Sequence, residues 1–260
     1  MYLCRIVKWI GWVCLAGSLQ AQSPDAASVL DRIEARQNTY VKYDSFSARI
    51  RTMVRDMDAS WSSKKTEKID KSVAVNGQER VEDILKAVRI EKGVETDVTE
   101  EYRKKESEAR SKRQKENLKS VAAEKDSGKD SEKHSISMDL GQLFPFAKDK
   151  RKEYLFSFWP DTVLADRPVI TVRVEAKEKS SERFNGRYWF DKETFDAVAF
   201  SVRPSKNPTF VKDMRMDMGF DVLDGKYLVP RTTFFQVYVN AIIKKFRMEV
   251  EEIYGDFTVR

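Results

Sequence analysis

The sequence predicts an α+β protein that is mainly β and is built on a long antiparallel sheet. The first observation is alternation, because apolar residues recur at every second position through much of residues 167–250, as in Met214, Met216 and Met218. In a strand this period places the apolar side chains on one face of the sheet and the polar ones on the other. The other two observations are the glycine-containing turn signals between these segments and a helical pattern at residues 24–40.

Residues 1–21 have the pattern of a signal peptide. Arg5 and Lys8 precede an uncharged apolar run at residues 9–19, which a small residue, Ala21, follows. The run is too short to span a bilayer comfortably, since that takes about 20 residues. We therefore expect export with cleavage after this segment. A lipidated cysteine and an uncleaved membrane anchor remain the alternatives.

Cysteine, histidine and charge argue against several function classes. Both cysteines, Cys4 and Cys14, lie in the predicted signal peptide, so the mature chain would hold no thiol nucleophile or thiolate metal ligand. The single histidine, His134, lies in a polar stretch without catalytic neighbours. The net charge of +6 comes from interleaved basic and acidic residues, which is typical of a solvated surface and not of a nucleic-acid site. We expect no enzyme activity, cofactor, metal or nucleic-acid partner.

The N-terminal part of the domain, residues 22–99, predicts a helix followed by strands. The helix at residues 24–40 is followed by an alternating segment around Phe46 and Ile50. A second strand is expected within residues 61–75, with Asn76 and Gly77 as its turn. Residues 81–90 fit either a helix or a strand, and the flanking glycines favour a strand.

Residues 100–134 form a highly charged insertion. Strong helix formers fill its first half, and Asp97 or Thr99 can cap a helix there. Its second half contains Gly128 and, from residue 125 to 133, no apolar side chain. We expect an exposed helix that gives way to a disordered linker. A short amphipathic helix that ends at Pro145 should follow it.

The C-terminal part, residues 135–260, predicts six or seven consecutive antiparallel strands, as in a sandwich or barrel. Phe156 and Phe158 share one face of the first strand, and residues 161–168 read as a loop. The pairs Asn185-Gly186 and Asp224-Gly225 are turn signals between later strands.

Two segments resemble a known family. Residues 184–210 read FNGRYWFDKETFDAVAFSVRPSKNPTF, and residues 224–230 read DGKYLVP. They resemble the strand–turn–strand element and the following hairpin of the LolA/LolB-like superfamily, the periplasmic lipoprotein-sorting proteins. The resemblance identifies the chain as a divergent member, because the charged insertion at 100–134 is foreign to the better-known carriers.

The resemblance implies an antiparallel half-barrel with helices on its concave face, and acyl chains held on that face. It implies a non-enzymatic carrier or chaperone in the periplasm of a Gram-negative type of cell envelope. Its expected partners are lipoprotein or lipid acyl chains and membrane-associated donor or acceptor proteins. The alternative is a periplasmic sensor or protein-interaction module that uses the same fold, with the charged helix as its docking arm.

Ten apolar residues are the candidate wall of the ligand cavity under this interpretation. They are Phe46, Ile50, Phe156, Phe158, Val172, Phe200, Met214, Met216, Met218 and Phe220. Methionine side chains are flexible and polarizable, and aromatic side chains add large apolar area, so both suit an adaptable acyl-binding wall. The same residues could equally be ordinary core.

Overall fold

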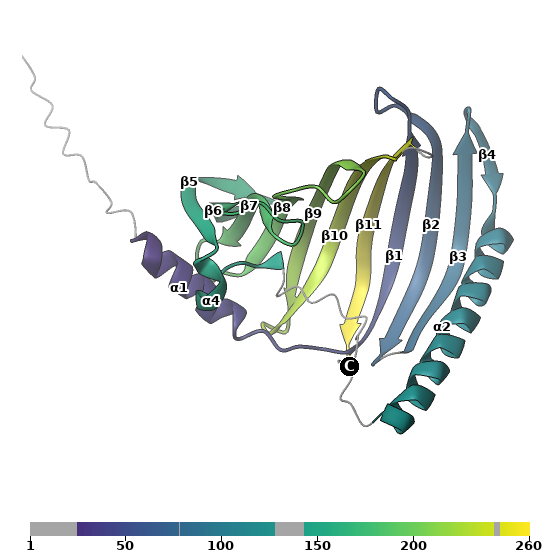
Figure 1. Ribbon diagram of the computed structural model, residues 1–260, viewed down its shortest axis with the longest axis horizontal. Helices are drawn as coiled ribbons and strands as arrows, with labels where there is room; N and C mark the ends of the chain where they lie inside the picture. The colour runs from purple at the N-terminus through teal and green to yellow at the C-terminus, as the bar shows by residue number, and fades with distance from the viewer. Residues whose placement is uncertain (1–24, 78, 128–142, 242–244) are drawn as a thin grey trace, which may run out of the picture.

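Eleven strands form one continuous antiparallel sheet in the computed structural model (Figure 1), which describes residues 25–77, 79–127, 143–241 and 245–260. The expected signal peptide and the end of the charged linker lie outside these ranges. The strand order across the sheet is β4-β3-β2-β1-β11-β10-β9-β8-β7-β6-β5. The strands are β1 (Ser45–Met57), β2 (Ser63–Asn76), β3 (Glu79–Glu91), β4 (Val94–Asp97), β5 (Tyr154–Leu164), β6 (Arg167–Ala176), β7 (Phe184–Asp191), β8 (Ala197–Pro204), β9 (Val211–Leu223), β10 (Tyr227–Asn240) and β11 (Lys245–Val259).

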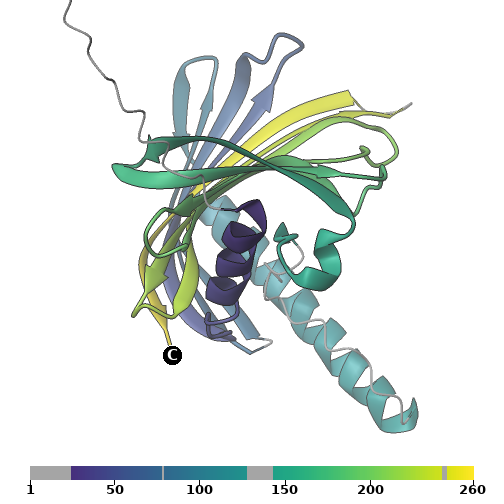
Figure 2. The ribbon, with the colours of Figure 1, turned by 90° about the vertical axis from the view of Figure 1, so that its left-hand side faces the viewer.

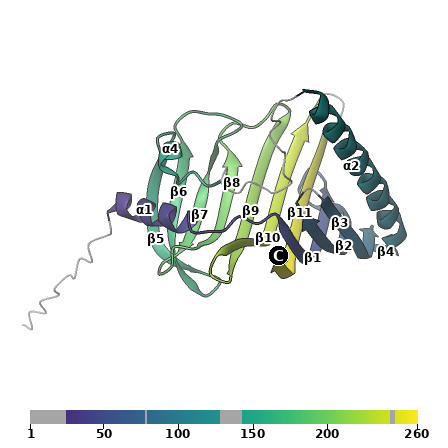
Figure 3. The ribbon, with the colours of Figure 1, turned by 90° about the horizontal axis from the view of Figure 1, so that it is seen from below.

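Helices cover the concave side of the curved sheet at its two ends. The helices within the described ranges are α1 (Ala26–Gln37), α2 (Thr99–Ser127) and α4 (Lys148–Arg151). Strands β5 to β8 arch over α1 and α4 (Figure 2), whereas α2 lies beside β3 and β4 at the opposite end (Figure 3). The predicted fold class, a mainly β half-barrel with helices on its concave face, is confirmed. Among the described helices, none is both long enough and apolar enough to cross a membrane.

The N- and C-terminal parts of the chain join in the middle of the sheet. Strand β1 pairs with β11 along most of its length, so that Ile50 lies opposite Tyr254. All other neighbouring strands are consecutive in sequence. Because β1 and β11 lie almost 200 residues apart, no turn signal could have predicted this pairing.

Several local predictions are confirmed. The helix predicted within residues 24–40 is present as α1, which begins after Asp25, whose side chain accepts a hydrogen bond from the amide of Ala27 at 3.4 Å. The ambiguous residues 81–90 form strand β3. Asp224 and Gly225 both have positive φ, 50° and 67°, as the central residues of a type I′ turn require.

Two turn predictions were wrong. Residues 161–168 are not a loop, because β5 continues through an irregularity around residues 160–161 and turns only at Ala165 and Asp166, which both have positive φ. Gly186 is not in a turn either, because it lies within β7 opposite Val202. A Cβ atom added at Gly186 would stand 2.2 Å from the carbonyl oxygen of Ser201, so this glycine permits a close approach of β7 and β8.

Candidate ligand-binding face

A row of paired residues crosses ten of the eleven strands, and it defines the concave face. Directly opposed residues in antiparallel strands point to the same face of the sheet. The row runs from β5 to β3 through Phe158, Val172, Tyr188, Phe200, Met218, Thr233, Glu252, Thr52, Ile69 and Ala87. Its two ends are apolar, and its three central members are polar.

A second row runs parallel to the first. It comprises Phe156, Val174, Gly186, Val202, Met216, Phe235, Val250, Val54, Glu67 and Arg89. Together with the alternation within β1 and β9, the two rows place all ten candidate wall residues on the concave face.

The ten candidates divide into buried and half-buried residues. The buried ones are Ile50, Val172, Phe200, Met218 and Phe220. The half-buried ones are Phe46, Phe156, Phe158, Met214 and Met216. Four of the buried residues belong to the main hydrophobic core, and Ile50 belongs to a smaller cluster with Ala48, Val73 and Val75.

Residues 143–147, the covering segment, pack on the concave face over β5 to β9. We call this part of the face the covered region. Phe144 packs on Tyr188, Phe200 and Phe220, with ring centroids 5.8–5.9 Å apart. Phe146 is fully buried and meets the rings of Tyr188 and Phe190 edge-on. Apolar residues of α1 belong to the same core cluster: Val29, Leu30 and Ile33. The wall residues of this region therefore already have partners.

Polar contacts hold this cover in place. The buried hydroxyl of Tyr188 donates a hydrogen bond to the carbonyl oxygen of Leu143 at 2.7 Å. Arg151 of α4 donates to the carbonyl oxygens of Leu30 and Phe146, both at 2.5 Å. Its guanidinium also pairs with the carboxylates of Asp31 and Glu34 in α1. One arginine thus links α4, the covering segment and α1.

Half-buried apolar residues continue the concave face beyond the cover, across β9, β10, β11 and β1. We call them the open strip: Met214, Met216, Phe235, Val239, Met248, Val250 and Val54. Only the first two were predicted as wall residues. The alternation within residues 233–239 and 246–250 was the available signal for most of the others.

The far end of the concave face, under α2, is charged. The carboxylate of Glu82 pairs with Lys71 at 2.8 Å and with Arg80 at 2.6 Å. Burial alone would raise the pKa of Glu82, but these two cations outweigh it and hold that pKa below its usual value. Glu67 pairs in the same way with Arg89 at 2.8 Å and with Lys65 at 3.3 Å.

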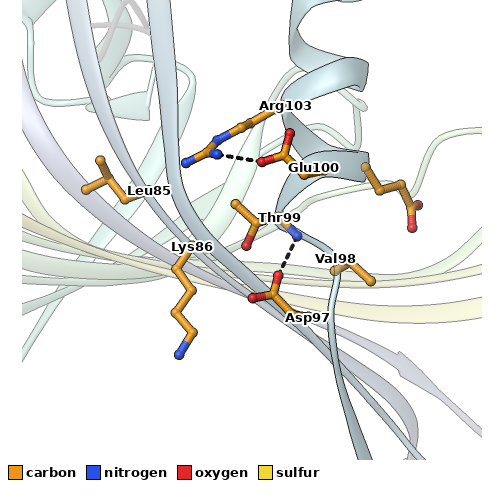
Figure 4. Close-up of a pocket in the computed structure, with 8 residues that line it drawn as sticks. Leu85, Lys86, Asp97, Val98, Thr99, Glu100 and Arg103 are labelled. Atoms are coloured by element: carbon orange, nitrogen blue, oxygen red, sulfur yellow. Dashed lines mark hydrogen bonds and ion pairs between the residues drawn. The ribbon is translucent and has the colours of Figure 1, made fainter.

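A surface hollow of ≈ 630 Å³ lies where β3 and β4 meet the start of α2 (Figure 4). The amide of Thr99 donates to the Asp97 carboxylate at 2.8 Å, and Arg103 pairs with Glu100 at 2.6 Å. Charged and polar side chains make up most of its lining, so this hollow lacks the apolar wall that an acyl chain needs. In the described ranges, no set of acidic, histidine or cysteine side chains is placed to hold a metal ion.

Two solved structures are similar to this chain along most of its length. A putative outer membrane lipoprotein-sorting protein domain from Vibrio parahaemolyticus is similar over 91% of this chain and 94% of its own, with a TM-score of 0.41 and 11% identity. A LolA superfamily protein from Nitrosomonas europaea covers 92% and 94%, with a TM-score of 0.35 and 11% identity.

A third similar structure is the lipoprotein LppX from Mycobacterium tuberculosis, with a TM-score of 0.23 and 6% identity over 90% of this chain and 96% of its own. No protein-family model and no curated protein sequence matches the chain. At these identities the likeness is one of fold alone.

Proposed function

We propose that this protein is a divergent LolA-like, non-enzymatic carrier or chaperone that binds lipidated or other apolar ligands on its concave face. The observation that carries the proposal is the open strip, in which methionine, phenylalanine and valine side chains lie side by side and remain partly exposed. Burying each CH₂ of an acyl chain against such a surface contributes roughly 0.8 kcal/mol without any specific polar contact.

The proposed place of action is the periplasm, where lipoproteins and acyl chains are the partners and membrane-associated proteins are the donors or acceptors. This location rests on the signal-peptide pattern of residues 1–21. It also agrees with the described part of the chain, which contains no cysteine and relies on its core.

Two neighbouring phenylalanines allow a matched test. Phe235 lies on the concave face opposite Met216 and Val250, whereas Phe234 lies on the convex face opposite Asp217 and Glu251. Changing Phe235→Asn should weaken binding of a fluorescent 12-carbon acyl probe about tenfold, since burying a phenylalanine side chain is worth roughly 1.5–3 kcal/mol. The Phe234→Asn variant should bind like the wild type. Equal effects of the two variants, or a wild type that neither binds the probe nor carries extractable lipid, would contradict the proposal.

The long helix α2 favours a second candidate function, a sensor or protein-interaction module. Most of the described side chains of this charged helix are exposed, while Tyr102 packs against the sheet and Arg110 reaches Glu79 at 3.6 Å. Deleting residues 100–134 separates the two functions. Lost partner binding with unchanged probe binding would favour the sensor.

A further inference from the structure

The centre of the concave face contains a polar group that the apolar-carrier function does not require. Thr233, Glu252 and Thr52 stand next to one another in the row that crosses the sheet, on β10, β11 and β1. Directly beside Glu252, in the second row, lies the apolar group Phe235, Val250 and Val54 of the open strip.

Within the described ranges, the Glu252 side chain accepts hydrogen bonds from hydroxyl groups only. Oε1 accepts a hydrogen bond from the hydroxyl of Thr52 at 3.2 Å, and Oε2 accepts one from the hydroxyl of Tyr254 at 2.7 Å. Burial and then the charge of Glu252 raise the pKa of Tyr254, so its hydroxyl stays protonated and able to donate. A carboxylate has about four acceptor positions, so Glu252 can accept further hydrogen bonds.

The basic residues of this face on β2 and β3 already have acidic partners. Lys71 and Arg80 pair with Glu82, and Lys65 and Arg89 pair with Glu67. Glu252 itself forms no ion pair with a described residue, although Arg80 lies near enough to its partner Tyr254 to act on that hydroxyl electrostatically. A half-buried carboxylate without a cationic partner is electrostatically complementary to a ligand that supplies one.

We infer that Glu252 binds the ammonium group of an amphiphilic ligand whose hydrocarbon chain lies on the open strip. The inference deepens the proposed function and rests on it, because it names the headgroup of the ligand that the concave face holds. An ammonium group supplies three hydrogen-bond donors and one positive charge. Thr52, Thr233 and Tyr254 provide oxygen atoms around the same position and so favour a polar headgroup there.

Two 12-carbon probes of opposite charge test this inference. At pH 7 dodecylamine is a cation and dodecanoate is an anion, since their pKa values resemble those of lysine and glutamate side chains. The wild type should bind dodecylammonium about tenfold more tightly than dodecanoate, as expected for a charge-assisted contact. The chain's net charge of +6 would favour the anionic probe, so nonspecific attraction cannot produce this preference.

Two glutamates of the same strand provide the variants. Glu252→Gln keeps the shape and the hydrogen-bond acceptor but removes the charge, so the preference for dodecylammonium should fall about tenfold, to near unity. Glu251→Gln is the control, because Glu251 faces the convex side, where its partner Arg55 also pairs with Glu249. Circular dichroism and thermal melting establish that both variants fold.

The outcomes separate the inference from the proposed function. Equal binding of both probes by the wild type overturns the inference alone. A preference that persists in the Glu252→Gln variant also overturns it, whatever Glu251→Gln does. If neither probe binds, both the carrier function and the inference fail.

Discussion

The covered region and the open strip belong to the same sheet face, yet they differ in what fills them. In the covered region Tyr188, Phe200 and Phe220 are buried beneath Phe144 and Phe146. In the open strip residues of the same apolar kind are only half-buried. The strand pattern is alike in both regions, so the elements that pack on the face decide which part is core and which part remains available to a ligand.

The largest expected effect tests this difference through two phenylalanines. Phe146→Ala removes a fully buried ring that meets Phe156, Tyr188 and Phe190, and it should lower the free energy of unfolding by about 3–5 kcal/mol. Phe235→Ala, in the open strip, should cost about 1 kcal/mol, because the ring is only half-buried. Urea denaturation measures both. Similar losses would show that the open strip is core as well.

The alternation in the sequence was sufficient to predict which residues share a face. Because the period of a strand is two, Met214, Met216 and Met218 had to lie together, and they do. The sequence could not predict which of these residues would be covered. Burial of Met218 follows from its place in the core cluster beneath α1 and the covering segment, and those contacts depend on packing between distant parts of the chain.

The errors at turns have a related cause. Asn185-Gly186 has the composition of a hairpin turn, yet Gly186 serves a close approach of strands, and the side chain of Asn185 accepts a hydrogen bond from the amide of Ala176 at 2.7 Å. A glycine can be needed because it adopts the positive φ of a turn, or because its lack of a side chain lets another strand approach closely. The sequence alone does not distinguish these two reasons. Glu252 was not predicted as a site residue, because the search for alternating apolar residues passes over an acidic side chain. Its position on the concave face follows from the pairing with Thr233.

A smaller effect should come from the arginine that links α4, the covering segment and α1. Arg151→Met removes the hydrogen bonds to Leu30, Phe146 and Glu34, and it should lower the free energy of unfolding by roughly 2 kcal/mol. If the cover limits ligand access, the same variant should bind the acyl probe at least as well as the wild type. Arg173→Met is the control, because this arginine is exposed and should change stability by no more than about 0.5 kcal/mol. An equal loss of stability in both variants would argue against a special role of Arg151.

The smallest effect is a pH dependence at the other end of α1. Arg36 pairs with Asp196 at 2.6 Å, and the hydroxyl of Tyr40 donates to the same carboxylate at 2.8 Å. Burial would raise the pKa of Asp196, but hydrogen bonds from Arg36, Thr194 and Tyr40 outweigh it and hold that pKa below its usual value.

The unfolded chain therefore binds a proton at Asp196 at a higher pH than the folded protein does. The stabilisation is complete above the unfolded pKa of about 3.9 and is lost as the pH falls through the lower folded value. The urea midpoint of the wild type should exceed that of Asp196→Asn at pH 7, and the gap should close as the pH falls below about 4. Asp161→Asn, which removes an exposed partner of Lys192, should follow the wild-type curve. A gap that stays constant down to pH 2 would show that the effect of the substitution does not depend on the ionised carboxylate of Asp196.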